Sequence, residues 1–282
     1  MTWLAHLRQD LDFGTRLILK SPGFSAIAIL TLAIGVGANT TIFSQINAVF
    51  WTMLPVPRPS ELRSIVWSSR KPAYVIGPNV IAGPHLPQGD TYGSVSYPAY
   101  VSMRDGAKSF AHLACWADLG EARPVVMREV GFGSVHFVSG NYFETLGVDA
   151  LLGRTFSATD DTPATTAAIL SYPFWQRTFG GDRDVLHRTI DLNGKSFAIV
   201  GVMPPGFFGV DAATPPDVLV PIAAVQLAAA TNNPIQNPGL WQMCRVVGRL
   251  RLGVSDPEAR ADAEQWLRTA ILARPPQAEY EL

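Results

Sequence analysis

The sequence has few of the residues from which catalytic and metal sites are built. Its 282 residues include two cysteines and five histidines, and no CxxC, HExxH or paired Cys/His spacing occurs, so no metal site is predicted. The histidines are scattered, and no Gly-x-Ser-x-Gly motif supplies a nucleophile. Asp160 with Asp161 and Asp182 with Asp184 lie beside turn residues, where solvated acids are common. The sequence therefore predicts neither an enzyme nor a cofactor.

Charged residues are also scarce, and neither sign dominates. Lysine and arginine total 22 against 23 for aspartate and glutamate, which gives a formal net charge of -1. A basic surface that binds nucleic acid is therefore not expected. Gly194-Lys195-Ser196 resembles the end of a phosphate-binding loop, but Thr189 stands where that loop needs glycine. Hydrophobic residues make up 48% of the chain, which is enough for a substantial folded core.

One long stretch, residues 21–54, has no charged residue at all. Ser21 is a good N-cap and Pro22 suits the first helical position, so these two residues mark the start of a helix. A helix of this length extends roughly 45 to 50 Å, which exceeds the ~30 Å hydrocarbon core of a bilayer. Residues 21–54 are therefore predicted to form one transmembrane helix.

A stripe of small residues runs along this predicted helix. They recur at spacings of three and four, which place them on one face where a second helix can approach closely. Chance is the alternative explanation, because alanine and glycine are common in any membrane helix. The predicted helix-packing stripe consists of Ala33, Gly37, Thr41, Ser44 and Ala48.

The flanks of the predicted membrane helix indicate its orientation. Residues 1–20 are predicted to form an amphipathic helix, suited to the membrane surface or to a cytoplasmic partner. Arg8, Arg16 and Lys20 lie close to the membrane, and short basic flanks are retained in the cytoplasm. The N-terminus is thus predicted to be cytoplasmic and residues 55–282 to lie outside. Signal-peptide cleavage near Ala38 is an alternative, although the uncharged run continues well past that residue.

Residues 55–282 have the pattern of a mixed α/β domain. Asn193-Gly194 between two strand-like runs predicts a hairpin, and Gly131-Phe132-Gly133 is predicted to be the turn of another. Ser255 and Glu258 have the capping-box spacing that begins a helix. Residues 72–93 are rich in glycine and proline and are predicted to form a long irregular loop. Strands are expected at 62–67, 110–117, 124–130, 134–138, 167–170, 189–192, 195–203, 217–222 and 243–250, and helices at 97–105, 140–146, 173–179 and from 255 onward.

The two cysteines leave a question open. Cys115 and Cys244 each lie in an apolar, strand-like run. One disulfide would suit an oxidising compartment, whereas two buried free thiols would suit an apolar core. The sequence alone favours neither state.

Several stretches, taken together, resemble the MacB-type ABC transporter permeases, in particular their duplicated orphan subgroup. SPGF at 21–24 and GVGANTTIF at 35–43 are similar to the first membrane helix of that family. VSGNYF at 138–143 is similar to the core of its periplasmic domain. The other matching stretches are LGV at 146–148, GRTF at 153–156, LSY at 170–172 with Trp175, FGG at 179–181, LNG at 192–194, GVMPPGF at 201–207, VVGRL at 246–250 and GVS at 253–255. Each is short, but their joint order is specific.

The resemblance implies a topology and a function. It implies a membrane-anchored α+β protein of the bacterial inner membrane, in which one N-terminal transmembrane helix precedes a periplasmic mixed α/β domain of two subdomains. Such permeases transmit ATP-driven motion across the membrane to the periplasmic domain. The chain is therefore expected to be the N-terminal part of an efflux or export permease. The alternative is a stand-alone, single-pass, membrane-tethered periplasmic binding or adaptor module.

The resemblance also implies partners. Further membrane helices of a permease and a separate ATP-binding subunit are expected, and a periplasmic adaptor is compatible with the family. These 282 residues contain neither the family's nucleotide-binding domain nor its closing membrane helices. ATP hydrolysis is accordingly expected from another chain, with this chain either a part of a permease or an anchored domain. The transported substrate does not follow from the sequence.

Overall fold

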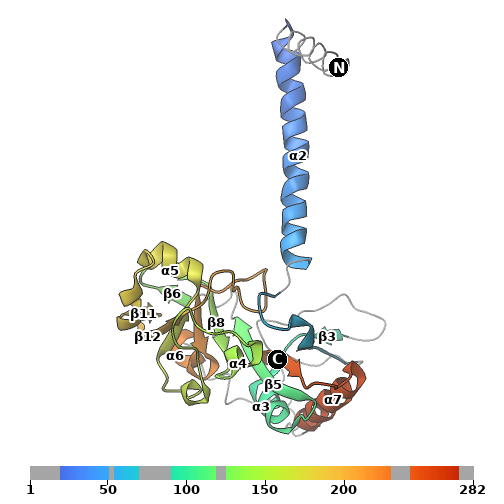
Figure 1. Cartoon of the computed structure of the whole chain (residues 1–282), viewed down its shortest axis with the longest axis vertical. Helices are drawn as coiled ribbons and strands as arrows, with labels where there is room; N and C mark the ends of the chain where they lie inside the picture. The colour runs from blue at the N-terminus through green and yellow to red at the C-terminus, as the bar shows by residue number, and fades with distance from the viewer. Residues whose placement is uncertain (1–19, 51–53, 70–89, 119–124, 230–241, 273–282) are drawn as a thin grey trace, which may run out of the picture. The chain divides into compact units, whose positions relative to one another are not determined.

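The computed structural model describes residues 20–50, 54–69, 90–118, 125–229 and 242–272. The chain divides into two units, Met1–Met53 and Leu54–Leu282, and each is described by itself. The described part of the first unit is helix α2 (Pro22–Phe50), so a helix is present where the uncharged run predicts one (Figure 1). Among the residues that the structure describes, no helix has both the length and the apolar character that crossing a membrane requires. The amphipathic helix predicted for residues 1–20 lies outside the described residues, apart from Lys20.

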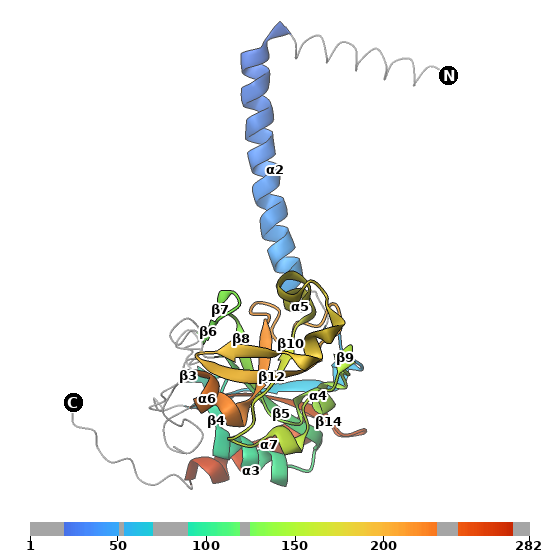
Figure 2. The ribbon, with the colours of Figure 1, turned by 90° about the vertical axis from the view of Figure 1, so that its left-hand side faces the viewer.

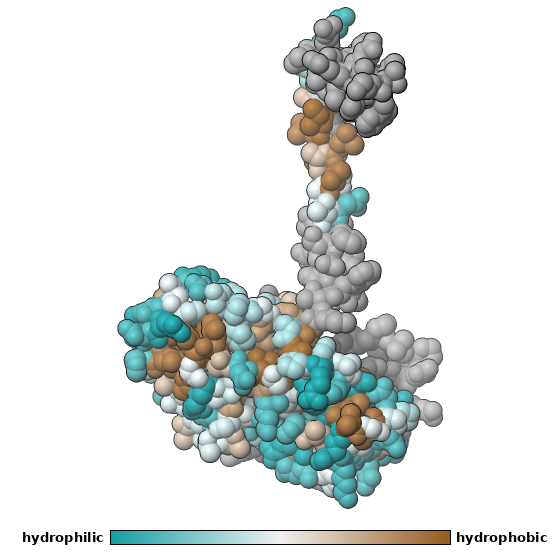
Figure 3. Space-filling model, in the orientation of Figure 1, coloured by the Kyte–Doolittle hydropathy of each residue, from teal (hydrophilic) through white to brown (hydrophobic). Residues whose placement is uncertain are grey.

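Helix α2 presents apolar side chains on its surface (Figure 3). The large ones that are exposed to between 57% and 70% are Ile27, Ile29, Leu30, Leu32, Ile34 and Val36. The hydroxyls of Thr31 and Thr40 donate hydrogen bonds of 2.8 Å to carbonyl oxygens four residues earlier in the helix. These polar side chains are therefore satisfied by their own helix. The described side chains around Thr31, which include Ile27, Leu30 and Ile34, are apolar and exposed.

Among the described residues of the second unit, twelve strands join one mixed sheet (Figure 2). They are β1 (Leu62–Ile65), β4 (Val95–Ser96), β5 (Phe110–Asp118), β6 (Val125–Met127), β7 (Gly131–Gly133), β8 (Val135–Val138), β9 (Leu152–Gly153), β10 (Ala167–Leu170), β11 (Thr189–Leu192), β12 (Lys195–Val202), β13 (Val218–Pro221) and β14 (Gln242–Leu250). Their order is β1-β14-β5-β8-β13-β10-β12-β11-β6-β7, with β4 beside β14 and β9 beside β12. Strands β2 (Trp67–Ser69) and β3 (Asp90–Tyr92) pair separately.

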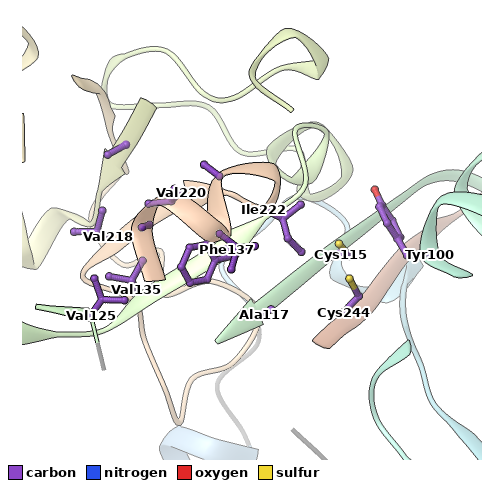
Figure 4. Packing of buried hydrophobic residues seen from close by; sticks show 14 of the residues in the cluster. Tyr100, Cys115, Ala117, Val125, Val135, Phe137, Val218, Val220, Ile222 and Cys244 are labelled. Atoms are coloured by element: carbon purple, nitrogen blue, oxygen red, sulfur yellow. The ribbon is translucent and has the colours of Figure 1, made fainter. Parts of the chain in front are cut away.

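Each face of this sheet carries an apolar core, because successive residues of a strand point to opposite faces. We call the two cores the first-face core and the second-face core. Along β5, Cys115 and Ala117 belong to the first-face core, and Ala114 and Trp116 belong to the second-face core. Figure 4 shows part of the first-face core. The first face is covered by α3 (Tyr97–Gly106), α5 (Tyr172–Phe179), α6 (Val225–Ala229) and α7 (Asp256–Leu272), and the second by α4 (Tyr142–Leu146). The 3-10 helices are η1 (Pro59–Glu61), η2 (Ala158–Asp160), η3 (Arg183–His187) and η4 (Ile222–Ala224).

The predicted strands and helices are present within a few residues, but the hairpin predicted around residues 131–133 is wrong. Gly131–Gly133 is itself strand β7, which pairs antiparallel with β6 after a turn at residues 128–130. Strand β8 lies instead between β5 and β13. All four residues of β8 are buried, as expected of a central strand that is covered on both faces.

A further difference concerns the stretch predicted to be an irregular loop. Residues 90–92, at the end of the stretch predicted to be an irregular loop, form β3 and pair with β2, while residues 70–89 lie outside the described part. The two subdomains that the resemblance implies stay a prediction, and residues Leu54–Leu282 form one compact unit in the structure. The pairing of β8 with both β5 and β13 joins the two ends of the sheet.

A stack of side chains crosses three neighbouring strands, β14, β5 and β8. The guanidinium of Arg245 lies 4.6 Å from the ring centroid of Trp116, whose ring stacks on His136 at 5.3 Å between centroids. Arg245 also pairs with Asp211 at 3.3 Å and with Asp118 at 3.7 Å. Burial lowers the pKa of His136 to about 4, although both carboxylates act in the opposite direction. His136 is therefore uncharged in the folded protein at neutral pH.

The low pKa of His136 predicts a loss of stability in mild acid. An unfolded histidine titrates near pH 6.5, so the unfolded chain binds more protons than the folded chain between pH 6.5 and about 4. The free energy of unfolding should fall by about 3 kcal/mol from this residue as the pH is lowered through that window. Urea unfolding followed by circular dichroism should show a shallower pH dependence for His136→Gln. The exposed His187 provides the control, and equal pH dependence in His136→Gln and His187→Gln would contradict the prediction.

Candidate functional site: the junction segment

The second unit begins with a proline-rich stretch, residues 54–62, here called the junction segment. Pro55, Pro57 and Pro59 restrict its backbone. Val56 is buried in the second-face core and is 8% exposed. Its N–H donates to the carbonyl of Leu54 at 2.7 Å. The first residues of the unit are thus fixed by burial and by a tight local turn.

One side chain, Arg249 of β14, holds the junction segment against the domain. Its exposed fraction is 6%. Nε donates to the carbonyl of Thr145 at 2.9 Å, and Nη2 donates to those of Leu146 and Pro57 at 3.1 Å each. Nη1 donates to the carbonyl of Arg58 at 3.2 Å and to Oε2 of Glu61 at 3.1 Å. All five N–H donors of this guanidinium are therefore used.

These bonds connect three parts of the fold. Thr145 and Leu146 end helix α4, where free carbonyls and the helix dipole favour a cation. Arg249 itself lies opposite Leu62 in the β14–β1 ladder, so the end of the junction segment continues directly into the sheet. The arginine consequently fixes the position of the junction segment relative to both α4 and β14.

The backbone of the junction segment is strained at Arg58. This residue has φ 48° and ψ 58°, a left-handed conformation that is uncommon for a residue other than glycine. Its carbonyl accepts from the N–H of Glu61 at 3.1 Å as well as from Arg249. Its guanidinium donates to Oε1 of Glu61 at 3.1 Å. The Glu61 carboxylate therefore pairs with both arginines and holds the strained turn in place.

A glycine contact and an exposed ion pair complete the surroundings. Gly147 ends α4 with φ 70°, and a Cβ built there would lie 3.6 Å from Cγ of Pro57. Arg63, which follows the junction segment, donates to Oδ1 of Asp256 at the start of α7 at 2.7 Å. The chain leaving the junction segment is thus also fastened to the helix that covers the other face of the sheet.

The predicted helix-packing stripe lies on α2. Ala33 and Gly37 are exposed on one face of the helix, and a Cβ at Gly37 would meet no heavy atom within 4 Å. Thr41, Ser44 and Ala48 belong to the helix, but their side chains lie outside the described ones. Whether this face packs against another helix stays a prediction.

Sequence reasoning missed the role of Arg249. The available signal is a single charged residue near the end of an apolar strand, Val246-Val247-Gly248-Arg249-Leu250. Its alternation places Arg249 on the same face as Val247, which belongs to the second-face core. A charge on a buried face requires partners. Elsewhere in the described residues, no group of three or more His, Cys, Asp or Glu side chains is arranged to hold a metal ion.

Comparison with known proteins gives a family and a fold. Residues 25–266 match the protein family described as MacB-like periplasmic core domain. The crystal structure of the periplasmic region of MacB from Actinobacillus actinomycetemcomitans is similar, with a TM-score of 0.52 and 9% identity over 81% of this chain and 88% of that chain. The extracellular domain of the noncanonic ABC-type transporter YknZ from Gram-positive bacteria gives 0.50 and 15% over 74% and 93%. A search of curated protein sequences gives no match.

The five hydrogen bonds of Arg249 predict a large cost for its removal. Arg249→Met keeps an apolar stem of similar length but leaves four carbonyls and Glu61 without this donor, so unfolding free energy should fall by about 3 to 5 kcal/mol. Arg249→Lys, which keeps the charge with fewer donors, should lose less. Urea unfolding of the full chain in detergent measures both losses.

The control for this substitution is Arg268→Met. Arg268 pairs with Glu264 at 2.7 Å on the exposed surface of α7, so its loss should change the unfolding free energy by less than about 0.5 kcal/mol. Amide hydrogen exchange should accelerate in residues 54–62 of Arg249→Met and not in those of Arg268→Met. Equal stability and equal exchange in the two variants would rule out a holding role for Arg249.

Proposed function

The chain belongs to the MacB-like periplasmic core domain family, and from this premise we propose that it is part of an ABC-type efflux or export permease. In this proposal, α2 lies in the bacterial inner membrane with the N-terminus in the cytoplasm, and the second unit lies outside the cytoplasm. The chain couples movement in the membrane to the second unit. The permease is of the duplicated orphan subgroup, and ATP hydrolysis belongs to a separate ATP-binding chain.

The surface of α2 supports its placement in the membrane. The isoleucine and leucine side chains of α2 that the structure describes are largely exposed in the chain taken alone, and such a surface requires an apolar partner. Lipid or further membrane helices would provide one, and the small residues Ala33 and Gly37 allow a close approach by a helix. The proposal concerns the whole uncharged run of residues 21–54, which extends beyond the side chains that the structure describes.

The bonding of the junction segment is the observation that carries the coupling. Helix α2 ends at Phe50 and the second unit begins at Leu54, so three residues connect them. That connection spans at most about 14 Å when extended. A displacement of α2 that exceeds the extended length of this connection therefore pulls on the junction segment. Arg249 transmits this displacement to β14 and α4, because its hydrogen bonds oppose removal of the junction segment from the domain.

The proposed topology predicts which residues a membrane-impermeant maleimide labels. Leu252 is fully exposed in the turn after β14, so Leu252→Cys should be labelled in whole cells whose outer membrane has been opened. Thr2→Cys should be labelled only after the inner membrane is broken. The native Cys115 and Cys244 are buried and should not react in either case. If the maleimide labelled Thr2→Cys but not Leu252→Cys in cells whose inner membrane is intact, the topology would be the opposite of the proposed one.

The coupling predicts an ATP-dependent change at the junction segment. The full chain with Ser60→Cys, an exposed position, is purified with its bound chains from its native membranes, labelled with an environment-sensitive fluorophore and placed in nanodiscs. Emission should change with MgATP and not with MgADP, and the change should shrink in Arg249→Lys. A fluorophore at exposed Arg268→Cys on α7 provides the control. If the emission at Ser60→Cys did not change with MgATP, the coupling would be rejected and the stand-alone tethered module would be favoured.

A further inference from the structure

The structure brings together the two cysteines, which lie far apart in the sequence. Cys115 is on β5 and Cys244 on the neighbouring antiparallel strand β14, where Val246 lies directly opposite Cys115. Cys244 is therefore a diagonal neighbour of Cys115. Both side chains point into the first-face core with no exposed surface. The Cys244 thiol is one of the groups that raise the pKa of Cys115, and Figure 4 shows the two sulfur atoms side by side.

We propose that Cys115 and Cys244 form a disulfide between β5 and β14 when the chain folds in an oxidising compartment. The inference rests on the extracytoplasmic placement of the second unit in the proposed function, because disulfides form and persist there. In the structure both residues are free thiols. Forming the bond removes two protons and two electrons from the thiols. A protein disulfide of the thiol oxidase class accepts them and becomes a dithiol.

The burial of the pair determines when the bond forms. Desolvation, with the hydrogen bond to Cys244 as a further cause, raises the pKa of the Cys115 thiol well above its usual range. The thiolate is the species that attacks a disulfide, so the folded pair reacts slowly. Oxidation therefore occurs during folding, before β5 and β14 close into the core. The finished bond is then protected from reductants and acts as a permanent cross-link.

The cross-link strengthens the strand that holds the junction segment. Arg249 and Cys244 lie on the same strand, and the bond fastens that strand to β5 in the interior of the sheet. It also closes a loop of more than 100 residues, and long loops give the largest reduction in the entropy of the unfolded chain. A displacement of the junction segment that acts on Arg249 is therefore resisted by β14, because the disulfide prevents β14 from separating from β5.

The geometry of the pair is tested by cell-free synthesis of the full chain into nanodiscs. One reaction contains a mixture of oxidised and reduced glutathione and the other contains dithiothreitol. Acid quenching and N-ethylmaleimide trap the thiols, and mass spectrometry maps tryptic peptides without reduction. In glutathione, the chain should lose about 2 Da through loss of two hydrogens, and the peptides of Cys115 and Cys244 should be linked. Alkylation of both cysteines in glutathione would overturn the proposal.

Thermal unfolding tests whether the bond fits the native fold. The oxidised chain should melt about 10 °C above the chain made in dithiothreitol. The double variant Cys115→Ala/Cys244→Ala should melt at the same temperature in both buffers. If the disulfide-bonded chain melted at or below the temperature of the reduced chain, the bond would belong to a distorted form and the proposal would fail.

A second measurement separates this proposal from the proposed location. Cells that make the full chain are quenched in acid, and their thiols are trapped in the same way. A linked pair in cells supports both statements. If the bond forms in glutathione but the thiols are free in cells, the extracytoplasmic placement fails and the disulfide geometry stands. If the thiols are free in both, the disulfide fails, and maleimide labelling of Leu252→Cys still decides the topology independently.

Discussion

The domain depends on one buried guanidinium, that of Arg249, whose N–H donors are all hydrogen-bonded. Arg249 is almost fully removed from solvent, and a buried charge is tolerated only when its donors are paired. Four of its five bonds go to backbone carbonyls, of Thr145, Leu146, Pro57 and Arg58. An apolar side chain could fill the same volume, but it could not orient these carbonyls. The arginine therefore specifies where the junction segment lies, which burial of Val56 alone does not.

The strained turn at Arg58 follows from this constraint. A left-handed residue other than glycine persists only where its surroundings determine it, and here the carbonyl of Arg58 is held by Arg249 while its guanidinium meets Glu61. Glu61 is shared with Arg249, so the turn and the buried charge stabilise each other. Loss of either side of this arrangement affects the other. The segment consequently behaves as one unit with β14 and α4.

Local signals in the sequence predicted local structure, and the long-range arrangement was not accessible to them. Asn193-Gly194 predicts a hairpin, and the structure has φ 50° and 80° at these residues, as a tight turn requires. Ser255 and Glu258 predict a cap, and the Glu258 carboxylate accepts from Ser255 N–H at 2.9 Å. Strand β8 pairs with β13, about 80 residues further along, so periodicity could not place it. The backbone carbonyls that bind Arg249 could not be recognised from the residue types, because every residue has a carbonyl.

Strand β14 links the two cores, and this bears on the coupling. Cys244 and Val246 point into the first-face core, and Val247 into the second. The junction segment contacts the second face through Arg249 and Val56, and in the proposed coupling a displacement there would reach α3 and α7 on the first face through β14. The ladder between β14 and β5 has to resist separation for that transfer to occur. Its direct pairs, the Arg245–Trp116 stack and the neighbouring cysteines all join these two strands, and in the proposed coupling they are the contacts that oppose separation of β14 from β5.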